Sequence, residues 1–283
     1  MLTASRSLRR AAKTGAAMPE VSFLSALHGA GVHFRPGQVV LVTGRPGAGK
    51  SNLVQSICTE WATEHDLTTL YYSLDMDPFT VGVRQAAAIT GHPQERISAA
   101  MDGPGEAYYE AELDGIPIAY CFDTRPELPD IQDELDAYVE LYDAYPAAMV
   151  IDNLLNIECG EGGHGDQKFV MRNMQELARR TGSCLFVLHH AREGVKDTTR
   201  PPTMAETDNK MNQIPEVILG VAHDDDTGEM SVAALKVRVG GKSDPAAERP
   251  FRLTADFSTM QFSAGRPTKS TSALDAYWSS VED

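Results

Sequence analysis

The chain has 283 residues, of which 42% are hydrophobic and 23% are charged, a balance that is typical of globular proteins and excludes a wholly disordered chain. No apolar run approaches the roughly 18 residues that a membrane-spanning helix needs, so the sequence also predicts that there is no membrane segment. The net charge is −15, and thirteen acidic residues against one arginine place −12 of it within residues 101–143, a run that we interpret as one solvated acidic face.

The two ends of the chain differ in composition from the middle. Residues 1–20 contain four cations and no acid before Glu20. Without an apolar stretch of the secretory type, they favour a flexible tail or a short helix that docks on a neighbouring subunit, with an organellar transit peptide as the alternative. Residues 263–283 predict a linker and a short amphipathic helix. We therefore expect a basic tail (1–20), one folded domain (21–262) and a C-terminal linker or tail (263–283).

Short apolar runs alternate with helical stretches between these tails. Strands are expected at 39–43, 69–73, 117–122, 147–152, 184–188, 217–221, 232–237 and 251–254. Helices are expected at 50–65, 80–90, 129–142 and 166–180. This alternation predicts an α/β fold with a mostly parallel, doubly wound sheet. The later strands are joined by turns, as at Asp226-Thr227-Gly228, and predict antiparallel hairpins at the C-terminal end.

A phosphate-binding motif follows the first expected strand. Residues 44–51 read G-R-P-G-A-G-K-S, which satisfies the P-loop pattern G-x-x-x-x-G-K-[ST] between a strand and a helix. Glycines let such a loop curl so that backbone N–H groups and the helix N-terminus face phosphate oxygens. We expect Lys50 to reach the β- and γ-phosphates of ATP and Ser51 to bind Mg²⁺. The expected nucleotide-binding residues are Gly44, Arg45, Pro46, Gly47, Ala48, Gly49, Lys50, Ser51 and Asn52.

Two carboxylates follow later strands of the expected sheet. Asp152 ends an apolar strand and is the expected Walker B acid, which would hold Mg²⁺ together with Ser51. Asp75 follows the strand at 69–73, and ligands bind at the carboxyl ends of parallel strands, so Asp75 is expected to orient the attacking water. The alternatives are a loop cap for Asp152 and, at the second site, a helix N-cap formed by Asp75 or Asp77.

Three further residues are candidates for contact with the terminal phosphate. His190 follows the strand at 184–188 and is expected to sense the γ-phosphate, with a structural histidine as the alternative; a metal pair with His189 is disfavoured because successive strand side chains point to opposite faces. Lys236 and Arg238 lie two residues apart on one face of a strand. A guanidinium from a neighbouring subunit would suit the developing phosphate charge, whereas surface cations on an edge strand are the alternative.

Five motifs in this order resemble the RecA-like ATPase domain of DnaB-type replicative helicases, over roughly residues 23–262. The stretch R-P-G-Q-V-V-L-V-T-G-R-P at 35–46 looks like that family's path into its Walker A motif. S-L-D-M at 73–76 is similar to S-L-E-M, and I-D-N-L at 151–154 is similar to I-D-Y-L. Residues 177–190 resemble the L-A-K-E-L stretch and sensor strand, and K-V-R at 236–238 matches the K-x-R finger.

The resemblance implies a homohexameric ring with ATP bound between neighbouring subunits and single-stranded DNA in a central channel. Lys236 and Arg238 would then act on the ATP of the next subunit, and the acidic segment would face outward. A loader or a primase would be a further partner, in the cytoplasm of a bacterium or of a phage-infected host. A channel loop at 192–210 would contact DNA phosphates through Arg192, Lys196, Arg200 and Lys210.

Two positions depart from that family's pattern. The catalytic Glu is Asp75 here, which is one methylene shorter, so the water must lie closer or turnover is slow. The sensor Gln is His190. We also expect that family's N-terminal primase-contacting domain to be missing, which disfavours coupling to a loader or primase.

The sequence therefore predicts an ATP-hydrolysing ring motor on single-stranded DNA, with the ATPase core of a replicative helicase. The first alternative is a RecA-like recombination or repair ATPase that forms filaments. The second is a nucleotide-gated loader or adaptor with little hydrolysis. Asp75 favours that second alternative, whereas the pair of Lys236 and Arg238 favours hydrolysis in trans.

Overall fold

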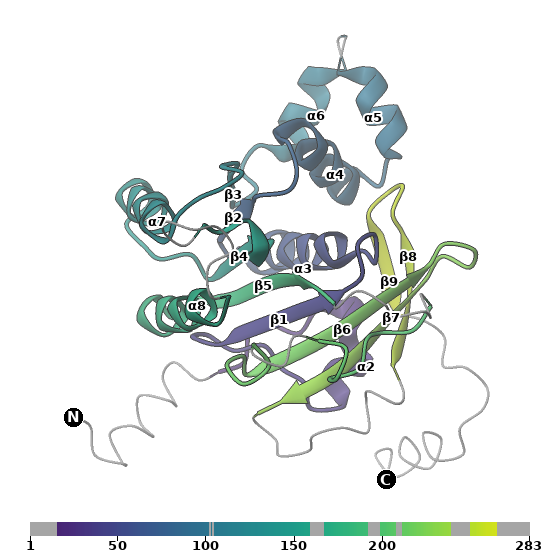
Figure 1. Cartoon of the computed structure of the whole chain (residues 1–283). Helices are drawn as coiled ribbons and strands as arrows, with labels where there is room; N and C mark the ends of the chain where they lie inside the picture. Colours follow the sequence, from purple (N-terminus) through teal and green to yellow (C-terminus); the bar gives the residue numbers. More distant parts are fainter. Residues whose placement is uncertain are drawn as a thin grey trace.

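One sheet runs through the computed structural model, which describes residues 16–101, 103, 105–158, 167–191, 199–207, 211–238 and 250–264. Across these residues the sheet has nine strands in the order β3-β2-β4-β5-β1-β6-β7-β8-β9 (Figure 1). The strands from β3 to β6 pair in parallel, and β6 to β9 pair as antiparallel neighbours. The predicted fold class, including the C-terminal hairpins, is confirmed.

The strands are β1 (Val39–Gly44), β2 (Thr69–Ser73), β3 (Ile118–Cys121), β4 (Ala148–Asp152), β5 (Cys184–His190), β6 (Val217–Asp224), β7 (Glu229–Val237), β8 (Phe251–Asp256) and β9 (Gln261–Ala264). The helices are η1 (Ser22–Leu24), α2 (Ser25–Gly29), α3 (Lys50–His65), α4 (Pro78–Thr90), α5 (Gln94–Ala100), α6 (Glu106–Leu113), α7 (Leu128–Tyr142), η2 (Leu154–Asn156) and α8 (Gln167–Thr181).

Each strand expected from the sequence is present, with ends that differ by a few residues. The expected hairpin turn joins β6 to β7, where Gly228 adopts a φ of 66° and its N–H donates to the carbonyl of Asp224. The sequence did not predict β9, α5 or α6. These elements are short, and β9 carries exposed or half-buried side chains, so neither period nor burial distinguishes it from a loop.

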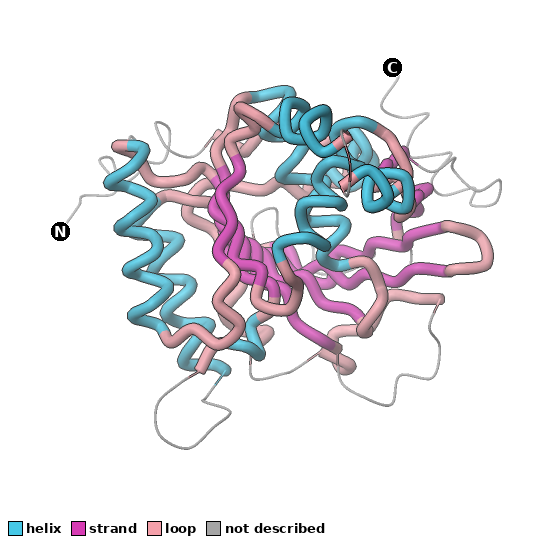
Figure 2. Tube along the Cα trace, turned by 90° about the horizontal axis from the view of Figure 1, so that it is seen from above, coloured by secondary structure: helices cyan, strands magenta, loops and turns pink. Residues whose placement is uncertain are grey.

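Different helices cover the two faces of the sheet, and Figure 2 shows helices on both sides of the strands. Successive residues of β1 point to opposite faces. Val40 and Val42 belong to the core cluster that contains the buried side of α3, whereas Val39 and Leu41 belong to the cluster that contains α7 and α8 residues. Burial on both faces explains why β1 reads as an uninterrupted apolar run.

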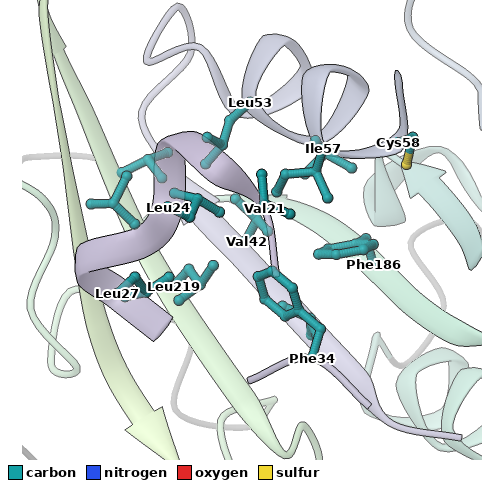
Figure 3. Close-up of a cluster of buried hydrophobic side chains, with 14 of the residues drawn as sticks. Val21, Leu24, Leu27, Phe34, Val42, Leu53, Ile57, Cys58, Phe186 and Leu219 are labelled. Atoms are coloured by element: carbon teal, nitrogen blue, oxygen red, sulfur yellow. The ribbon is translucent and has the colours of Figure 1, made fainter. Parts of the chain in front are cut away.

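The core under α3 fixes the position of the P-loop. Val42 of β1 packs near Leu53 and Ile57 of α3, and Leu24 and Phe186 complete this part of the cluster (Figure 3). Each of these side chains is almost completely buried. Burial of one such side chain stabilises a fold by about 1.5–3 kcal/mol, so strand and helix hold the intervening loop from both ends.

The two expected tails lie mostly outside the described residues, at 1–15 and 265–283. Packing begins at Met18, whose N–H donates to the carbonyl of Phe34, and Trp61 donates through Nε1 to the carbonyl of Pro19. The acidic residues that are described within 101–143 are all exposed, which agrees with a solvated face. Over the described ranges, none of the helices combines the length and the apolar character that crossing a bilayer would require.

Candidate nucleotide site

The loop between β1 and α3 has a backbone that requires glycine at several positions. Gly47 and Gly49 both adopt a φ of 78°. A side chain at Gly44 would place its Cβ 2.6 Å from the carbonyl oxygen of Val221. Gly49 is the N-cap of α3 and supplies no side-chain cap, so the N–H groups of the first turn can bind an anion instead. The loop therefore has the geometry of a phosphate cradle.

Lys50 lies folded over this loop. Its Nζ donates to the carbonyl of Arg45 at 2.9 Å and lies 3.2 Å from Nδ1 of His190. Burial lowers the pKa of Lys50 to about 8, and the charges of Asp152 and Asp75 act in the opposite direction. A triphosphate would supply the stronger negative partner that this buried amine lacks.

Asp152 lies at the end of β4 beside the start of α3. It is 3% exposed, and the hydroxyl of Tyr71 donates to its Oδ2 at 2.9 Å. Burial raises the pKa of Asp152, whereas hydrogen bonds from Ser51 and Tyr71 lower it. The two residues predicted to bind Mg²⁺, Ser51 and Asp152, are therefore in direct contact.

The donor set at this contact fits Mg²⁺, because a hydroxyl and a carboxylate are hard oxygen ligands. No cluster of three or more His, Cys, Asp or Glu side chains within the described residues could hold a metal alone. In nucleotide sites Mg²⁺ is usually held by one or two protein oxygens together with the phosphates. Ser51 and Asp152 would provide the protein's share.

Asp75 is separate from the cap of the following helix. The N-cap of α4 is Asp77, whose Oδ1 accepts from the N–H of Thr80 at 3.0 Å. Asp75 is exposed at the carboxyl end of β2, and Nδ2 of Asn153 donates to its Oδ2 at 2.5 Å. The N-cap alternative for Asp75 is therefore wrong, and its carboxylate is available at the edge of the sheet where ligands bind.

His190 ends β5 directly beside the P-loop, paired in register with Gly44. Its Nδ1 contacts Lys50, and its Nε2 lies 3.3 Å from Nδ2 of Asn153. Burial lowers the pKa of His190, and the Lys50 charge lowers it further. The neutral imidazole is thus favoured, at the point where the chain leaves the sheet toward the predicted channel loop.

Lys236 and Arg238 lie at the opposite edge of the sheet from the P-loop, where the parallel strands begin. Because β7 runs antiparallel to β6, its end pairs with Val217, whereas Gly44 of the P-loop pairs with Val221. Val217 and Val221 are four residues apart in β6, which corresponds to about 13 Å along the strand. The predicted finger residues are therefore not brought together with the P-loop of their own chain.

Backbone carbonyls hold both finger residues. Nζ of Lys236 donates to the carbonyl of Asn212 at 2.6 Å, and Nη2 of Arg238 donates to the carbonyl of Gln213 at 2.9 Å. Burial lowers the pKa of Lys236, and the charge of Arg238 lowers it further. Both cations are thus anchored by the segment that leads into β6.

A buried carboxylate, Glu216, organises the same edge. Its Oε2 accepts from the N–H of Val39 at 3.0 Å, and its Oε1 accepts from Gln175 at 3.0 Å and Arg179 at 3.4 Å. Oε1 also lies 3.7 Å from Nη1 of Arg238. Glu216 therefore links the start of β1, helix α8 and Arg238, the residue that follows β7.

The predicted channel loop is only partly described. Arg192, Lys196 and Lys210 lie outside the described residues. Arg200 makes a two-pronged ion pair with Glu206, at 2.9 and 2.7 Å. The hydrogen bonds from Arg200 lower the pKa of Glu206 to about 2. The charge of Arg200 is therefore paired within its own segment, and its contact with DNA stays a prediction.

The site also contains Tyr71, Asn153 and Glu216, which were not predicted from the sequence as site residues. Asn153 offered a signal, because it directly follows the Walker B acid. Tyr71 and Glu216 offered none, since a tyrosine within an apolar strand reads as core and a glutamate before a strand reads as surface. Their contacts join segments that are 81 and 177 residues apart in the chain.

Comparison with known proteins gives the family. Residues 27–195 match AAA_25, described as an AAA domain. The Gene 65 protein of Mycobacterium phage L5 is 33% identical over 271 residues, which cover 93% of this chain and 96% of that protein. The replicative DNA helicase DnaB of Leifsonia xyli subsp. xyli is 38% identical over 67 residues, or 24% of this chain and 14% of that protein.

Solved structures show the same fold. One solved ATPase domain superimposes with a TM-score of 0.74 at 14% identity, over 93% of this chain and 96% of that one. A DnaB-like replicative helicase, solved with its interactions with primase, gives 0.69 at 15% identity, over 81% of this chain and 59% of that one. With its P-loop and its match to AAA_25, the chain belongs to the AAA-domain family and is a relative of the phage Gene 65 proteins, and it has the RecA-like fold of the solved ATPase domains.

Proposed function

We propose that the chain is the subunit of an ATP-hydrolysing ring that acts on single-stranded DNA, as the ATPase core of a replicative helicase. One observation carries this proposal. The P-loop and its partner side chains lie at the carboxyl edge of the parallel strands, whereas Lys236 and Arg238 lie at the opposite edge. A site that uses both halves needs a second copy of the chain, and repetition of such a head-to-tail contact closes into a ring.

The chemistry is transfer of the γ-phosphoryl group of ATP to water. P-loop N–H groups and Lys50 would bind the phosphates, and Ser51 and Asp152 would hold Mg²⁺, which neutralises charge on the β- and γ-oxygens when it is bound. Asp75 would orient the water and accept its proton while the new O–P bond forms. The bond from phosphorus to the β–γ bridging oxygen breaks, and ADP leaves.

Cations around the transferred group would stabilise its transition state. Negative charge spreads over the equatorial oxygens, so preorganised donors at that point lower the barrier. Lys50 and His190 would supply them from the same chain. Lys236 and Arg238 of the next copy would supply them from across the interface.

The role of DNA is supported by the position of the segment after β5. The N–H of Ala191 donates to the carbonyl of Gly44, so the chain leaves His190 while still attached to the P-loop. A change at the phosphate would therefore reach the start of the predicted channel loop directly. The helicase relatives and the phage-encoded relative support action on DNA in the cytoplasm of a bacterial or phage-infected cell, with a loader or primase as a further partner.

A mixing experiment tests the proposal. Lys50→Ala removes phosphate binding and keeps Arg238, whereas Arg238→Ala keeps the P-loop and removes the finger. Each variant alone should be inactive. An equal mixture should regain activity at about a quarter of its interfaces, where an intact P-loop meets an intact finger. A mixture that stays inactive, while wild type hydrolyses ATP, would contradict action in trans.

The particle and its response to DNA decide between the remaining candidates. ATPase rates with and without single-stranded DNA, measured beside light scattering, should show a DNA-stimulated hexamer. Open filaments on DNA would instead support a recombination or repair ATPase. The short Asp75 side chain favours one more candidate, a nucleotide-gated loader or adaptor, and ATP binding without turnover would support it.

A further inference from the structure

Asn153 contacts two of the predicted catalytic side chains with one nitrogen atom. Its Nδ2 lies 2.5 Å from Oδ2 of Asp75 and 3.3 Å from Nε2 of His190. Asn153 itself is 3% exposed, whereas the Asp75 carboxylate is exposed. A buried amide thus connects the residue that follows β2 with the last residue of β5.

The orientation of this amide is fixed by a third hydrogen bond. Oδ1 of Asn153 accepts from the N–H of Leu155 at 2.8 Å and caps the short helix η2. A flip of the amide would face its NH₂ group toward that N–H and its oxygen toward the Asp75 carboxylate. Both contacts would be repulsive, so Nδ2 faces Asp75 and His190.

His190 is in contact with two donors, Nδ2 of Asn153 and the amine of Lys50. A neutral imidazole has one acceptor nitrogen and one N–H, so it cannot accept from both. A triphosphate at the P-loop would draw Lys50 away. Nε2 would then accept from Asn153, which leaves the proton on Nδ1, the nitrogen that faces the P-loop.

We propose that Asn153 is a positioning residue for ATP hydrolysis, whose amide orients the Asp75 carboxylate toward water and sets His190 to donate through Nδ1–H to the terminal phosphate. The inference rests on the proposed ATPase function and deepens it. The same three positions differ from the motifs that this chain resembles, where Glu, Tyr and Gln stand in place of Asp75, Asn153 and His190. In this chain the Asn153 amide would therefore position both the shorter carboxylate, Asp75, and the different sensor, His190.

The variants must separate this role from the capping of η2. Asn153→Ser retains an oxygen that can cap the Leu155 N–H and removes the nitrogen that contacts Asp75. Asn153→Asp retains both the size and the capping oxygen, and replaces the donor by an oxygen that repels Asp75. Asn156→Ser is the matched control, because Asn156 is the last residue of the helix that Asn153 caps and its amide donates to the carbonyls of Leu74 and Thr124 instead.

The experiment compares nucleotide affinity, steady-state turnover and melting temperature of the full chain. Asn153→Ser and Asn153→Asp should bind a fluorescent ATP analogue within twofold of wild type and lose kcat by about 10- to 100-fold, the size of effect expected from a misplaced catalytic group. Asn156→Ser should retain kcat within about threefold. Addition of Asp75→Glu should restore part of the kcat lost in Asn153→Ser, because the longer side chain can reach the water without the amide.

Each outcome decides the inference. Normal kcat in both Asn153 variants of an active enzyme would overturn it and leave the proposed function intact. Loss of nucleotide binding or of folding in both variants would assign Asn153 a structural role and overturn it as well. An inactive wild type would remove the proposed function and the inference together, which is a distinct result. Selective loss of kcat with partial rescue by Asp75→Glu would establish it.

Discussion

The two edges of the parallel sheet are built in different ways. At the carboxyl edge, Lys50, Asp152 and His190 follow buried strands and contact each other or the P-loop directly. At the opposite edge, the half-buried Lys236 and the exposed Arg238 are bound by backbone carbonyls of the segment that leads into β6. The first edge therefore holds its side chains around the P-loop of its own chain, and under the proposed function the second edge would meet the ATP of another copy.

The largest expected effect is the loss of ATP binding when Lys50, at the carboxyl edge, is replaced. Lys50→Ala should weaken ATP binding by about 100-fold or more, because the variant loses the charged donor that pairs with the β- and γ-phosphates. Isothermal titration with a non-hydrolysable analogue measures this effect. Lys236→Ala, which removes a lysine from the other edge, is the control and should bind within twofold of wild type. Unchanged affinity in Lys50→Ala would exclude the P-loop assignment.

The opposite edge should affect turnover rather than binding. Arg238→Ala should leave nucleotide affinity intact and lower kcat by about 10³, as expected for loss of a charge-stabilising finger. Steady-state ATPase assays measure it. Arg179→Ala is a matched control, because Arg179 contacts the same Glu216 from helix α8 and has no predicted role in hydrolysis. If both variants hydrolyse ATP equally well, Arg238 has no role in trans.

Glu216 tests how Arg238 is held, because its carboxylate contacts both Arg238 and the N–H of Val39 at the start of β1. Glu216→Gln keeps an oxygen for the Val39 N–H and removes the charge beside Arg238. We expect a decrease in kcat of about three- to tenfold with unchanged ATP affinity, because the guanidinium loses part of its orientation. A lower melting temperature with normal kcat would show that Glu216 is structural only.

The smallest effect is expected at the ion pair between Arg200 and Glu206. The pKa of Glu206 is lowered from its ordinary 4.5 to about 2, so the pair adds stability above pH 4.5 that is lost as the pH falls toward 2. Arg200→Ala should remove this part of the acid dependence and change little at neutral pH, because the pair is partly exposed. Melting temperatures between pH 2 and 7 measure the difference. An acid profile identical to that of wild type would show that the pair contributes nothing.

Sequence reasoning succeeded where local pattern and burial agree. The apolar runs of β1, β4 and β5 are strands buried on both faces, and the P-loop pattern depends on a backbone that only glycine tolerates. It failed for β9 and α6, because short exposed elements leave no apolar period. The ion pair between Arg200 and Glu206 could not be predicted either, because the sequence gives no sign of which acid a loop cation contacts.

The sequence by itself determined the fold class, the phosphate loop and the order of the motifs, since these follow from local periodicity and from residue types at fixed spacing. The tertiary structure decided which side chains meet. Only the folded sheet brings Tyr71 to Asp152, Asn153 to Asp75 and Glu216 to Val39, and only the antiparallel direction of β7 sets Arg238 apart from the P-loop of its own chain. Such contacts join residues that are distant in the chain, and a single sequence carries no local signal for a hydrogen bond across that distance.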